Sequence, residues 1–350
     1  MGVFTQVPEQ TLNSAMQRYG RGALVAWEPT PHGIENSNFF VTTEDSSGHR
    51  HEWVLTFLEQ PPSSTGLETL ARLARAGLPV PAPVPTSGGD LVPRVDGHPT
   101  LLAPRLRGAH PLEPEPEQCA AIGRFLGRMH RLTAALPGPE HPRNLLWLER
   151  GWRTHGRRLG HADSDLMRQA LDGIISAMGR RDWQLLPAGI VHGDLFRDNA
   201  LMDGGTLTGV IDFHHAARAP LLFDLAVVAN DWCIAGDRLA GDRRAGDRQA
   251  EDLSQTGTQA ARIGPEPLEA HLDEACTASL LQAYGAERAL TDAERWFWPV
   301  MLSLAALRFW IARLDSPRKP PEEMARHLAG YLRRPPRLDH GAPPQERGDA

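Results

Sequence analysis

Strand-forming and helix-forming residue patterns occupy different parts of this chain, and their separation restricts the fold. The first 105 residues hold runs dense in β-branched and aromatic residues at 24–28, 38–43 and 53–58, with shorter strand signals at 91–92 and 100–103. Beyond residue 108, apolar residues recur at helical spacing instead. Strands followed by helices predict an α+β fold with two lobes: a small β-rich N-lobe over 1–105 and a larger, mainly helical C-lobe over 106–334.

Helices are predicted where apolar residues return every three or four positions. In the N-lobe they are expected over 1–20 and 67–76, and every second residue of the following segment 79–85 is proline, which makes that segment an extended connector. In the C-lobe, helices are expected over 118–132, 160–180, 222–234, 268–285, 292–314 and 321–333.

Two segments lack the pattern of a folded core. Residues 235–267 repeat the sequence AGDR three times and contain no aromatic residue, and residues 335–350 contain two PP pairs. We expect the first to be a disordered insertion on the surface and the second to be a disordered tail, because neither offers enough apolar surface to bury.

Composition excludes several classes of protein. The net charge of −6 gives no basic surface, so nucleic acid is not an expected partner. The chain begins without a signal-peptide pattern, and its longest apolar run, 300–314, is interrupted by two arginines, so we expect a buried helix and no membrane partner. Three widely spaced cysteines argue against a disulfide framework and fit the cytoplasm.

The chemistry is concentrated between two short strands. The sequence HGDLFRDN occupies 192–199, and VIDF follows at 210–213. A carboxylate at Asp194, a carboxamide five residues later at Asn199 and a second carboxylate at Asp212 form the residue set that kinase-type phosphoryl transfer requires. A surface loop whose Asp and Asn only form turns is the alternative, and the agreement of spacing with local structure argues against it.

Each of the three residues suits one task. Asp194 orients an acceptor hydroxyl and takes its proton. A weak base is sufficient, because phosphoryl transfer passes through a loose transition state and the proton is removed late. Asn199 and Asp212 offer the oxygen ligands that Mg²⁺ accepts beside nucleotide phosphates and water. We expect His192 to brace the loop through side-chain hydrogen bonds.

Several blocks of the chain resemble one family. HGDLFRDN, GVIDF and LLFDLA resemble the aminoglycoside phosphotransferase superfamily, the small-molecule branch of the protein-kinase-like fold. The blocks at 1–7, 33–43, 53–59, 77–84, 221–233 and 306–314 resemble, more narrowly, the homoserine kinases within it. This resemblance implies an α+β, bilobal, protein-kinase-like fold and an enzyme that uses ATP and Mg²⁺ to phosphorylate the hydroxyl of L-homoserine.

The resemblance also implies a nucleotide site. The turn at 33–38 would lie over the phosphates, and its named candidates are Gly33, Asn36, Ser37 and Asn38. Kinases hold these phosphates with a lysine on the third strand, but Thr56 occupies that position and the only lysine in the chain is Lys319. Arg197 is a candidate for the missing cation, and an ion pair with Asp198 is its alternative role.

Candidates for the acceptor site lie on two helices. Asp231 could hold an ammonium group, and Arg308, inside an apolar helix, could hold a carboxylate or a structural ion pair. His214 and Trp232 could shape the pocket. We expect Asp224 to brace the catalytic loop and His130 to be structural.

Two alternatives stay open on the sequence alone. A kinase for choline or an aminoglycoside would use the same catalytic residues with another pocket. A pseudokinase that binds nucleotide without catalysis would account for the missing lysine, but not for the intact Asp194, Asn199 and Asp212.

Overall fold

The computed structural model describes residues 7–30, 36–59, 62–235, 271–316 and 319–338. The chain forms two compact units, which are described separately below. We call Met1–His110 with Asp198–Ala216 the sheet unit, and Pro111–Arg197 with Ala217–Ala350 the helical unit. The expected insertion and tail lie almost entirely outside the described residues.

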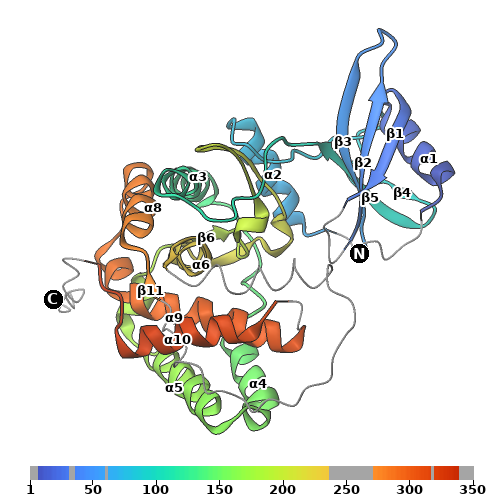
Figure 1. Ribbon diagram of the computed structural model, residues 1–350. Coiled ribbons are helices and arrows are strands. Elements are labelled where there is room, and N and C mark those ends of the chain that lie inside the picture. Colours follow the sequence, from blue (N-terminus) through green and yellow to red (C-terminus); the bar gives the residue numbers. More distant parts are fainter. Residues whose placement is uncertain (1–6, 31–35, 60–61, 236–270, 317–318, 339–350) are drawn as a thin grey trace, which may run out of the picture. The chain divides into compact units, whose positions relative to one another are not determined.

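The sheet unit is built on five antiparallel strands in the order β1-β2-β3-β5-β4 (Figure 1). The strands are β1 (Ala23–Pro29), β2 (Ser37–Glu44), β3 (Arg50–Phe57), β4 (Arg94–Val95) and β5 (His98–Pro104). Every second side chain of β2 is buried, as the two-residue period of a strand with one covered face requires. The predicted strands at 24–28, 38–43, 53–58 and 100–103 are confirmed.

One strand lies a few residues from its predicted place. Residues 91–92 were expected to be extended, but the backbone N–H of Val92 donates to the Asp90 side chain at 3.0 Å and so closes a turn there. The strand β4 starts after Pro93 and pairs with β5 across Asp96 and Gly97. Both turn residues have positive φ, 51° and 85°, as a tight hairpin of the primed type requires.

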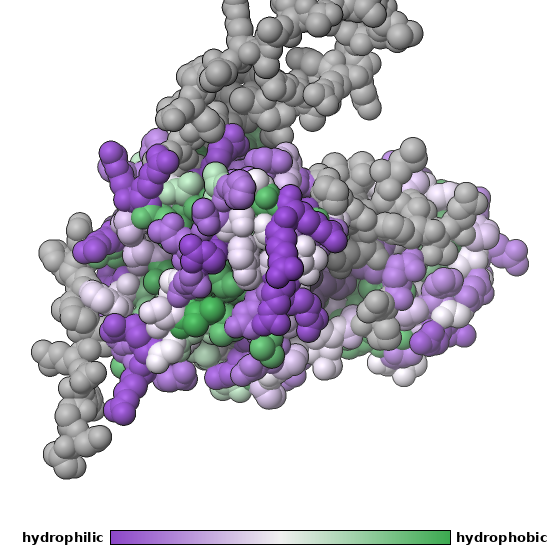
Figure 2. All heavy atoms as spheres, turned by 90° about the horizontal axis from the view of Figure 1, so that it is seen from below, coloured by the Kyte–Doolittle hydropathy of each residue, from purple (hydrophilic) through white to green (hydrophobic). Residues whose placement is uncertain are grey.

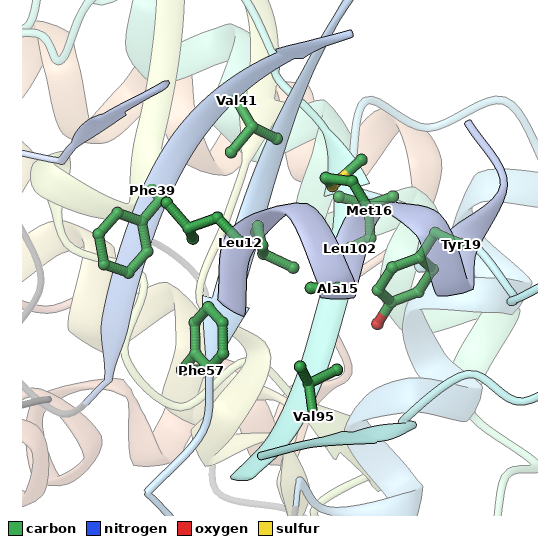
Figure 3. Packing of buried hydrophobic residues seen from close by; sticks show 10 residues of the cluster. Leu12, Ala15, Met16, Tyr19, Phe39, Val41, Phe57, Val95 and Leu102 are labelled. Atoms are coloured by element: carbon green, nitrogen blue, oxygen red, sulfur yellow. The ribbon is translucent and has the colours of Figure 1, made fainter. Parts of the chain in front are cut away.

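Helix α1 (Glu9–Tyr19) covers one face of this sheet. Figure 3 shows Leu12, Ala15, Met16 and Tyr19 directed at strand residues that include Phe39, Phe57 and Leu102, and all of these side chains are at most 2% exposed. The helix presents them at positions three and four apart, which places them on one stripe. This cluster is the core of the sheet unit.

A second piece of chain completes the sheet unit. Strands β7 (Ala200–Asp203) and β8 (Thr206–Val210) form a hairpin, and Met202 bridges to Ala109 while the Val210 N–H donates to the Pro79 carbonyl at 2.9 Å. These bonds join a hairpin from the middle of the sequence to the proline-rich connector. A division of the chain at a single position therefore does not describe the sheet unit.

The helical unit contains the predicted helices, one helix that was not predicted (α4), and two small antiparallel strand pairs. Its helices are α3 (Pro116–Thr133), α4 (Leu145–His155), α5 (His161–Met178), α6 (Leu222–Trp232), α8 (Glu274–Glu287), α9 (Asp292–Asp315) and α10 (Pro321–Arg333). Its strand pairs are β6 (Ala188–Val191) with β9 (Ala217–Pro220), and β10 (Ile234–Ala235) with β11 (His271–Leu272). The helix expected over 268–285 starts later, because β11 precedes it and the Asp273 side chain caps it through the Cys276 N–H at 2.8 Å.

Helix α9 is the apolar centre of the helical unit, and α10 runs beside it (Figure 1). By length and composition α9 could cross a membrane, but 78% of its apolar window is buried in the structure. It is therefore a core helix, as predicted for the run 300–314. On the face shown in Figure 2, hydrophilic residues predominate and the hydrophobic ones are scattered among them in several small groups.

The three cysteines, far apart in the sequence, lie in the same region of the helical unit. All three are buried free thiols, and the Sγ atoms of Cys119 and Cys233 are 4.0 Å apart. Helix α3 approaches α8 closely here because residue 123 is glycine: a Cβ there would lie 2.4 Å from the Leu280 carbonyl oxygen.

Candidate active site

The loop that follows β6 is held by one buried carboxylate. Asp224, near the start of α6, accepts hydrogen bonds from the backbone N–H groups of His192 at 2.7 Å and Gly193 at 2.8 Å. Gly193 has φ 82°, a conformation that favours glycine. The prediction that Asp224 braces this loop is confirmed.

The brace continues into the helical core. Asp224 is fully buried and also contacts Nε2 of His130 at 3.0 Å, and Nδ1 of His130 lies 2.9 Å from the Tyr284 hydroxyl. Burial alone would raise the pKa of Asp224, but the bond and charge of His130, with the loop N–H groups, hold it below its ordinary value. The structural role predicted for His130 is confirmed.

Asp194 is the half-buried residue of this braced loop. Its backbone N–H donates to Nδ1 of His192 at 3.3 Å, so His192 braces the loop as predicted. The Phe196 N–H donates to the Asp194 carbonyl at 2.9 Å, which turns the chain sharply after the half-buried carboxylate. The loop thus fixes the backbone of Asp194 on both sides.

Arg197 forms its ion pair with Asp231. The Asp231 carboxylate accepts from the Arg197 backbone N–H at 2.7 Å and from its Nε at 3.2 Å, and Nη1 of Arg197 donates to the Leu112 carbonyl. Burial raises the pKa of the Asp231 carboxyl, against the opposing effect of Arg197. The indole of Trp232, fully buried, donates to the Leu195 carbonyl at 3.3 Å. The end of α6 therefore supports the loop through three hydrogen bonds, two to Asp231 and one from Trp232.

The other two residues of the motif lie in the sheet unit. The Ile211 N–H donates to the Asn199 carbonyl at 3.0 Å, and the pairing of β7 with β8 begins directly after it. This register places Asn199 beside the end of β8, where Asp212 follows. Asp212 is exposed and has φ 64°, a strained conformation for a residue with a Cβ.

The predicted phosphate turn lies beside Asp212. Nε2 of His214 lies 3.2 Å from Nδ2 of Asn36 and 3.8 Å from the Asp212 carboxylate. The Asn36 side chain also accepts from the Glu59 N–H at 3.1 Å. Gly33 lies outside the described residues. The Asn36–His214 contact joins positions 178 residues apart, so no local pattern in the sequence could have indicated it.

Thr56 occupies the strand position where kinases carry lysine. Its hydroxyl donates to the Asn38 side chain at 2.7 Å, and the neighbouring Ser37 is fully buried. Asn38 and Thr56 are direct partners across β2 and β3. The cross-strand bond fixes Asn38 at the start of β2, but it supplies no positive charge.

Arg308 carries its charge inside the helical unit. It is 6% exposed, its guanidinium lies 4.1 Å from the Phe223 ring centroid, and its Nε and Nη1 find no hydrogen-bond partner in the part of the chain that the structure describes. Burial, with the charge of Arg143, lowers the pKa of Arg308 to about 9. A buried cation without an anion is costly, so this site favours an anionic ligand.

The residue types present fit a magnesium–nucleotide complex. Asn199 and Asp212 provide one amide and one carboxylate oxygen, and no group of three or more His, Cys, Asp or Glu that could hold a metal occurs among the described residues. Mg²⁺ commonly takes only one or two protein oxygens and completes its octahedron with phosphates and water. A two-ligand set is therefore sufficient for this ion.

Fold and site together define a phosphotransferase. Residues 26–260 match the model of the phosphotransferase enzyme family, and the chain belongs to that family. Among solved structures, an aminopropanol kinase covers 93% of this chain and 94% of its own with a TM-score of 0.60 at 19% identity. An amicoumacin kinase solved with AMP-PNP and Ca²⁺ covers 93% and 92% with a TM-score of 0.59 at 17% identity. The bilobal, protein-kinase-like α+β fold is thereby confirmed.

Curated relatives narrow the assignment within the family. Homoserine kinase from Cupriavidus pinatubonensis is 36% identical, and those from Pseudomonas aeruginosa and Methylobacillus flagellatus are 34% and 33% identical. Each alignment covers 90% of this chain and 87–88% of the relative. The chain therefore falls in the homoserine kinase branch of the family.

Proposed function

We propose that this protein phosphorylates the side-chain hydroxyl of L-homoserine with the γ-phosphoryl group of ATP, as a step of threonine biosynthesis in the cytoplasm. The observation that carries the proposal is the intact set Asp194, Asn199 and Asp212 in a chain whose curated relatives are homoserine kinases. The substrate is a small molecule, and no observation favours choline or an aminoglycoside over it.

Asp194 is the proposed base. Its loop is fixed by Asp224 through two backbone N–H groups, so the carboxylate keeps its position when substrate binds. It accepts a hydrogen bond from the homoserine hydroxyl, aligns the oxygen with the γ-phosphorus and takes the proton late in the transfer. A carboxylate is basic enough for this role, because the hydroxyl proton becomes acidic as the oxygen–phosphorus bond forms.

Asn199 and Asp212 are the proposed ligands of Mg²⁺. When bound, the ion neutralises charge on the nucleotide phosphates. Asp212 projects from a strained turn, and His214 lies beside it and beside Asn36. We therefore assign His214 to joining the phosphate turn to the metal ligand, and no longer to contacting homoserine. Asn36, Ser37 and Asn38 remain the proposed phosphate-side residues, with Thr56 orienting Asn38.

Arg308 is the proposed partner of the homoserine carboxylate. It is the buried cation that lacks a carboxylate in the described part of the helical unit, and Arg143 adds positive charge near it. Asp231 was expected to hold the ammonium group, but its carboxylate is engaged by Arg197 at 3.2 Å. We assign Asp231 and Trp232 to holding the catalytic loop.

The change Asp194→Asn tests the proposed base. The variant keeps the size and the backbone contacts of the loop but cannot accept the proton, so we expect kcat to fall by roughly 10²- to 10⁴-fold. ATP affinity, measured by calorimetry in the presence of Mg²⁺, should stay within about twofold, since the proposed nucleotide ligands lie in the sheet unit. Turnover near the parent value would remove Asp194 from this role.

A further inference from the structure

The buried network behind the catalytic loop extends beyond the carboxylate that holds it. Asp224 accepts the backbone N–H groups of His192 and Gly193, and Nε2 of His130 lies 3.0 Å from the same carboxylate. On the other side of the ring, Nδ1 of His130 lies 2.9 Å from the Tyr284 hydroxyl. The inference below rests on the proposed function, because it treats this loop as the catalytic one, and it concerns what holds the far end of the network.

The far end is an ion pair at the junction of α8 and α9. Arg288, the residue directly after α8, donates from Nη1 to the Tyr284 hydroxyl at 2.8 Å. The same guanidinium donates to both carboxylate oxygens of Glu294, at 2.8 Å and 3.1 Å. Glu294 is fully buried and also accepts from the N–H and the hydroxyl of Thr291, the cap of α9. A bidentate pair with a carboxylate that is itself fixed in a helix cap therefore holds the guanidinium against Tyr284.

The direction of donation is fixed at both ends of this chain of hydrogen bonds. Arg288 can only donate, so the Tyr284 oxygen accepts from it. Burial alone would raise the pKa of Asp224, but its hydrogen bond with His130 lowers it below the ordinary value, so the carboxyl is ionised and can only accept. Nε2 of His130 therefore donates to it. His130 and Tyr284 are fully buried, so a bond removed from the chain leaves a polar group that water cannot satisfy.

We propose that Tyr284 and Arg288 are positioning residues for phosphoryl transfer. They act through His130, whose ring orientation decides where the Asp224 carboxylate lies, and that carboxylate fixes the backbone directly before Asp194. The loop carries the proposed base, and misplacing a catalytic group by about 1 Å costs on the order of 100-fold in rate. The junction of α8 and α9 thus contributes to catalysis, although its residues act only through others.

The first test removes one hydroxyl. Tyr284→Phe keeps the ring, and Asp224 keeps its bonds to the loop, so kcat should fall roughly 10-fold while both KM values stay within about twofold. The matched control is Tyr331→Phe in α10, which removes a hydroxyl that is also buried and that donates to Asn230 at 2.9 Å. The control should lose similar stability in urea and keep its kcat. A Tyr284→Phe variant with the kcat of the parent, or an equal loss of kcat in the control, would overturn the proposal.

The second test concerns the ion pair at the far end. Arg288→Lys keeps a cation beside the buried Glu294, but an ammonium group does not reproduce the planar fork of the guanidinium, so kcat should fall about three- to fivefold. The matched control is Arg131→Lys, because Arg131 forms an exposed pair with Glu287 at 3.3 Å between α3 and α8. That variant should keep the kcat of the parent. Equal kcat values in Arg288→Lys and in the parent would contradict the role of Arg288.

A third measurement does not depend on turnover. The N–H groups of His192 and Gly193 donate to Asp224, so their hydrogen exchange, followed by NMR, reports on the brace directly. Both amides should exchange roughly five- to tenfold faster in Tyr284→Phe and at the parent rate in Tyr331→Phe. Unchanged exchange in Tyr284→Phe would refute the inference. If the unaltered protein phosphorylates no homoserine, the proposed function fails, while the exchange rates still decide whether the network holds the loop.

Discussion

Single charged residues have most of the proposed functional roles. Among those described, Arg308 has the least satisfied hydrogen-bonding groups. Its position over Phe223 gives the guanidinium an aromatic neighbour, but a ring quadrupole is a weak substitute for a carboxylate. The lowered pKa of Arg308, about 9, expresses the cost of keeping it charged in that place. A buried cation of this kind lowers the stability of the fold, and a protein retains it where it binds an anionic ligand.

This cost gives a prediction that a structural role would not share. Arg308→Met removes a buried charge and keeps most of the side-chain volume, so the free energy of unfolding should rise by about 1–2 kcal/mol or stay unchanged. The KM for homoserine should rise by roughly 10- to 100-fold while that for ATP changes little. Urea unfolding and steady-state kinetics measure the two effects.

The paired arginine on the same helix is the control. Arg313→Met leaves Glu323 without its 2.7 Å partner, so that variant should lose stability. If Arg308→Met also loses stability and raises both KM values equally, Arg308 is structural.

Residues that lie in one contiguous motif could be assigned from the sequence, and their distant partners could not. The spacing of Asp194, Asn199 and Asp212 is visible in the sequence, as is the bracing carboxylate at Asp224. The pairing of Arg197 with Asp231 spans 34 residues, and spacing alone favoured Asp198. Only the folded chain shows which distant carboxylate reaches the guanidinium.

Among the elements, helices with a regular apolar stripe were predictable and irregular ones were not. Helix α3 and helix α5 have clear stripes and lie close to their expected ranges. Helix α4 was not expected, because its apolar residues at 145–148 are consecutive and one of them, Leu146, is 68% exposed. A helix of this kind is fixed by its Asn144 cap and by contact with α9, which local periodicity does not contain.

Helix α10 should make the stability of the helical unit depend on pH. His327 is 1% exposed on the face of α10, and burial lowers its pKa from 6.5 to about 4, against the opposite effect of Glu323. As the pH falls below about 6.5, His327 is protonated in the unfolded chain but stays neutral in the native protein. Stability is therefore lost as the pH falls from about 6.5 to about 4. Between pH 7 and pH 5 the loss should be about 2 kcal/mol.

The variant His327→Leu isolates this contribution. Its free energy of unfolding, measured in urea at both pH values, should fall by about 2 kcal/mol less than that of the parent over the same interval. An identical pH dependence in parent and variant would show that His327 is protonated in the native state or does not govern this transition.

At the scale of the whole molecule, the two units and their order could be predicted from the sequence. The sequence did not indicate that residues 198–216 belong to the sheet unit. The family resemblance identifies the catalytic motif in the sequence. The hairpin β7–β8 is joined to the sheet unit by hydrogen bonds to Ala109 and Pro79, and no local sequence pattern indicates these bonds. The unit boundary consequently falls inside the motif, between Arg197 and Asp198.

The AGDR segment should be dispensable for activity. Its described flanks, β10 and β11, pair through Ala235 and His271, so the chain leaves and re-enters the helical unit at neighbouring points. Replacing residues 236–264 with a short glycine-serine linker should therefore leave kcat and both KM values within about twofold, because a loop whose ends are already paired costs little to shorten. Loss of activity in a variant that still folds by circular dichroism would show that the segment takes part in function.

The proposed homoserine kinase activity is tested most directly by measuring which acceptor the protein phosphorylates. ATP consumption with Mg²⁺ is measured over homoserine, serine, threonine, choline and kanamycin, and the phosphorylated product is identified by mass spectrometry. We expect homoserine to have the highest kcat/KM and to yield a singly phosphorylated product, with that activity lost in Asp194→Asn. Phosphorylation of choline or kanamycin without phosphorylation of homoserine would contradict the proposed function.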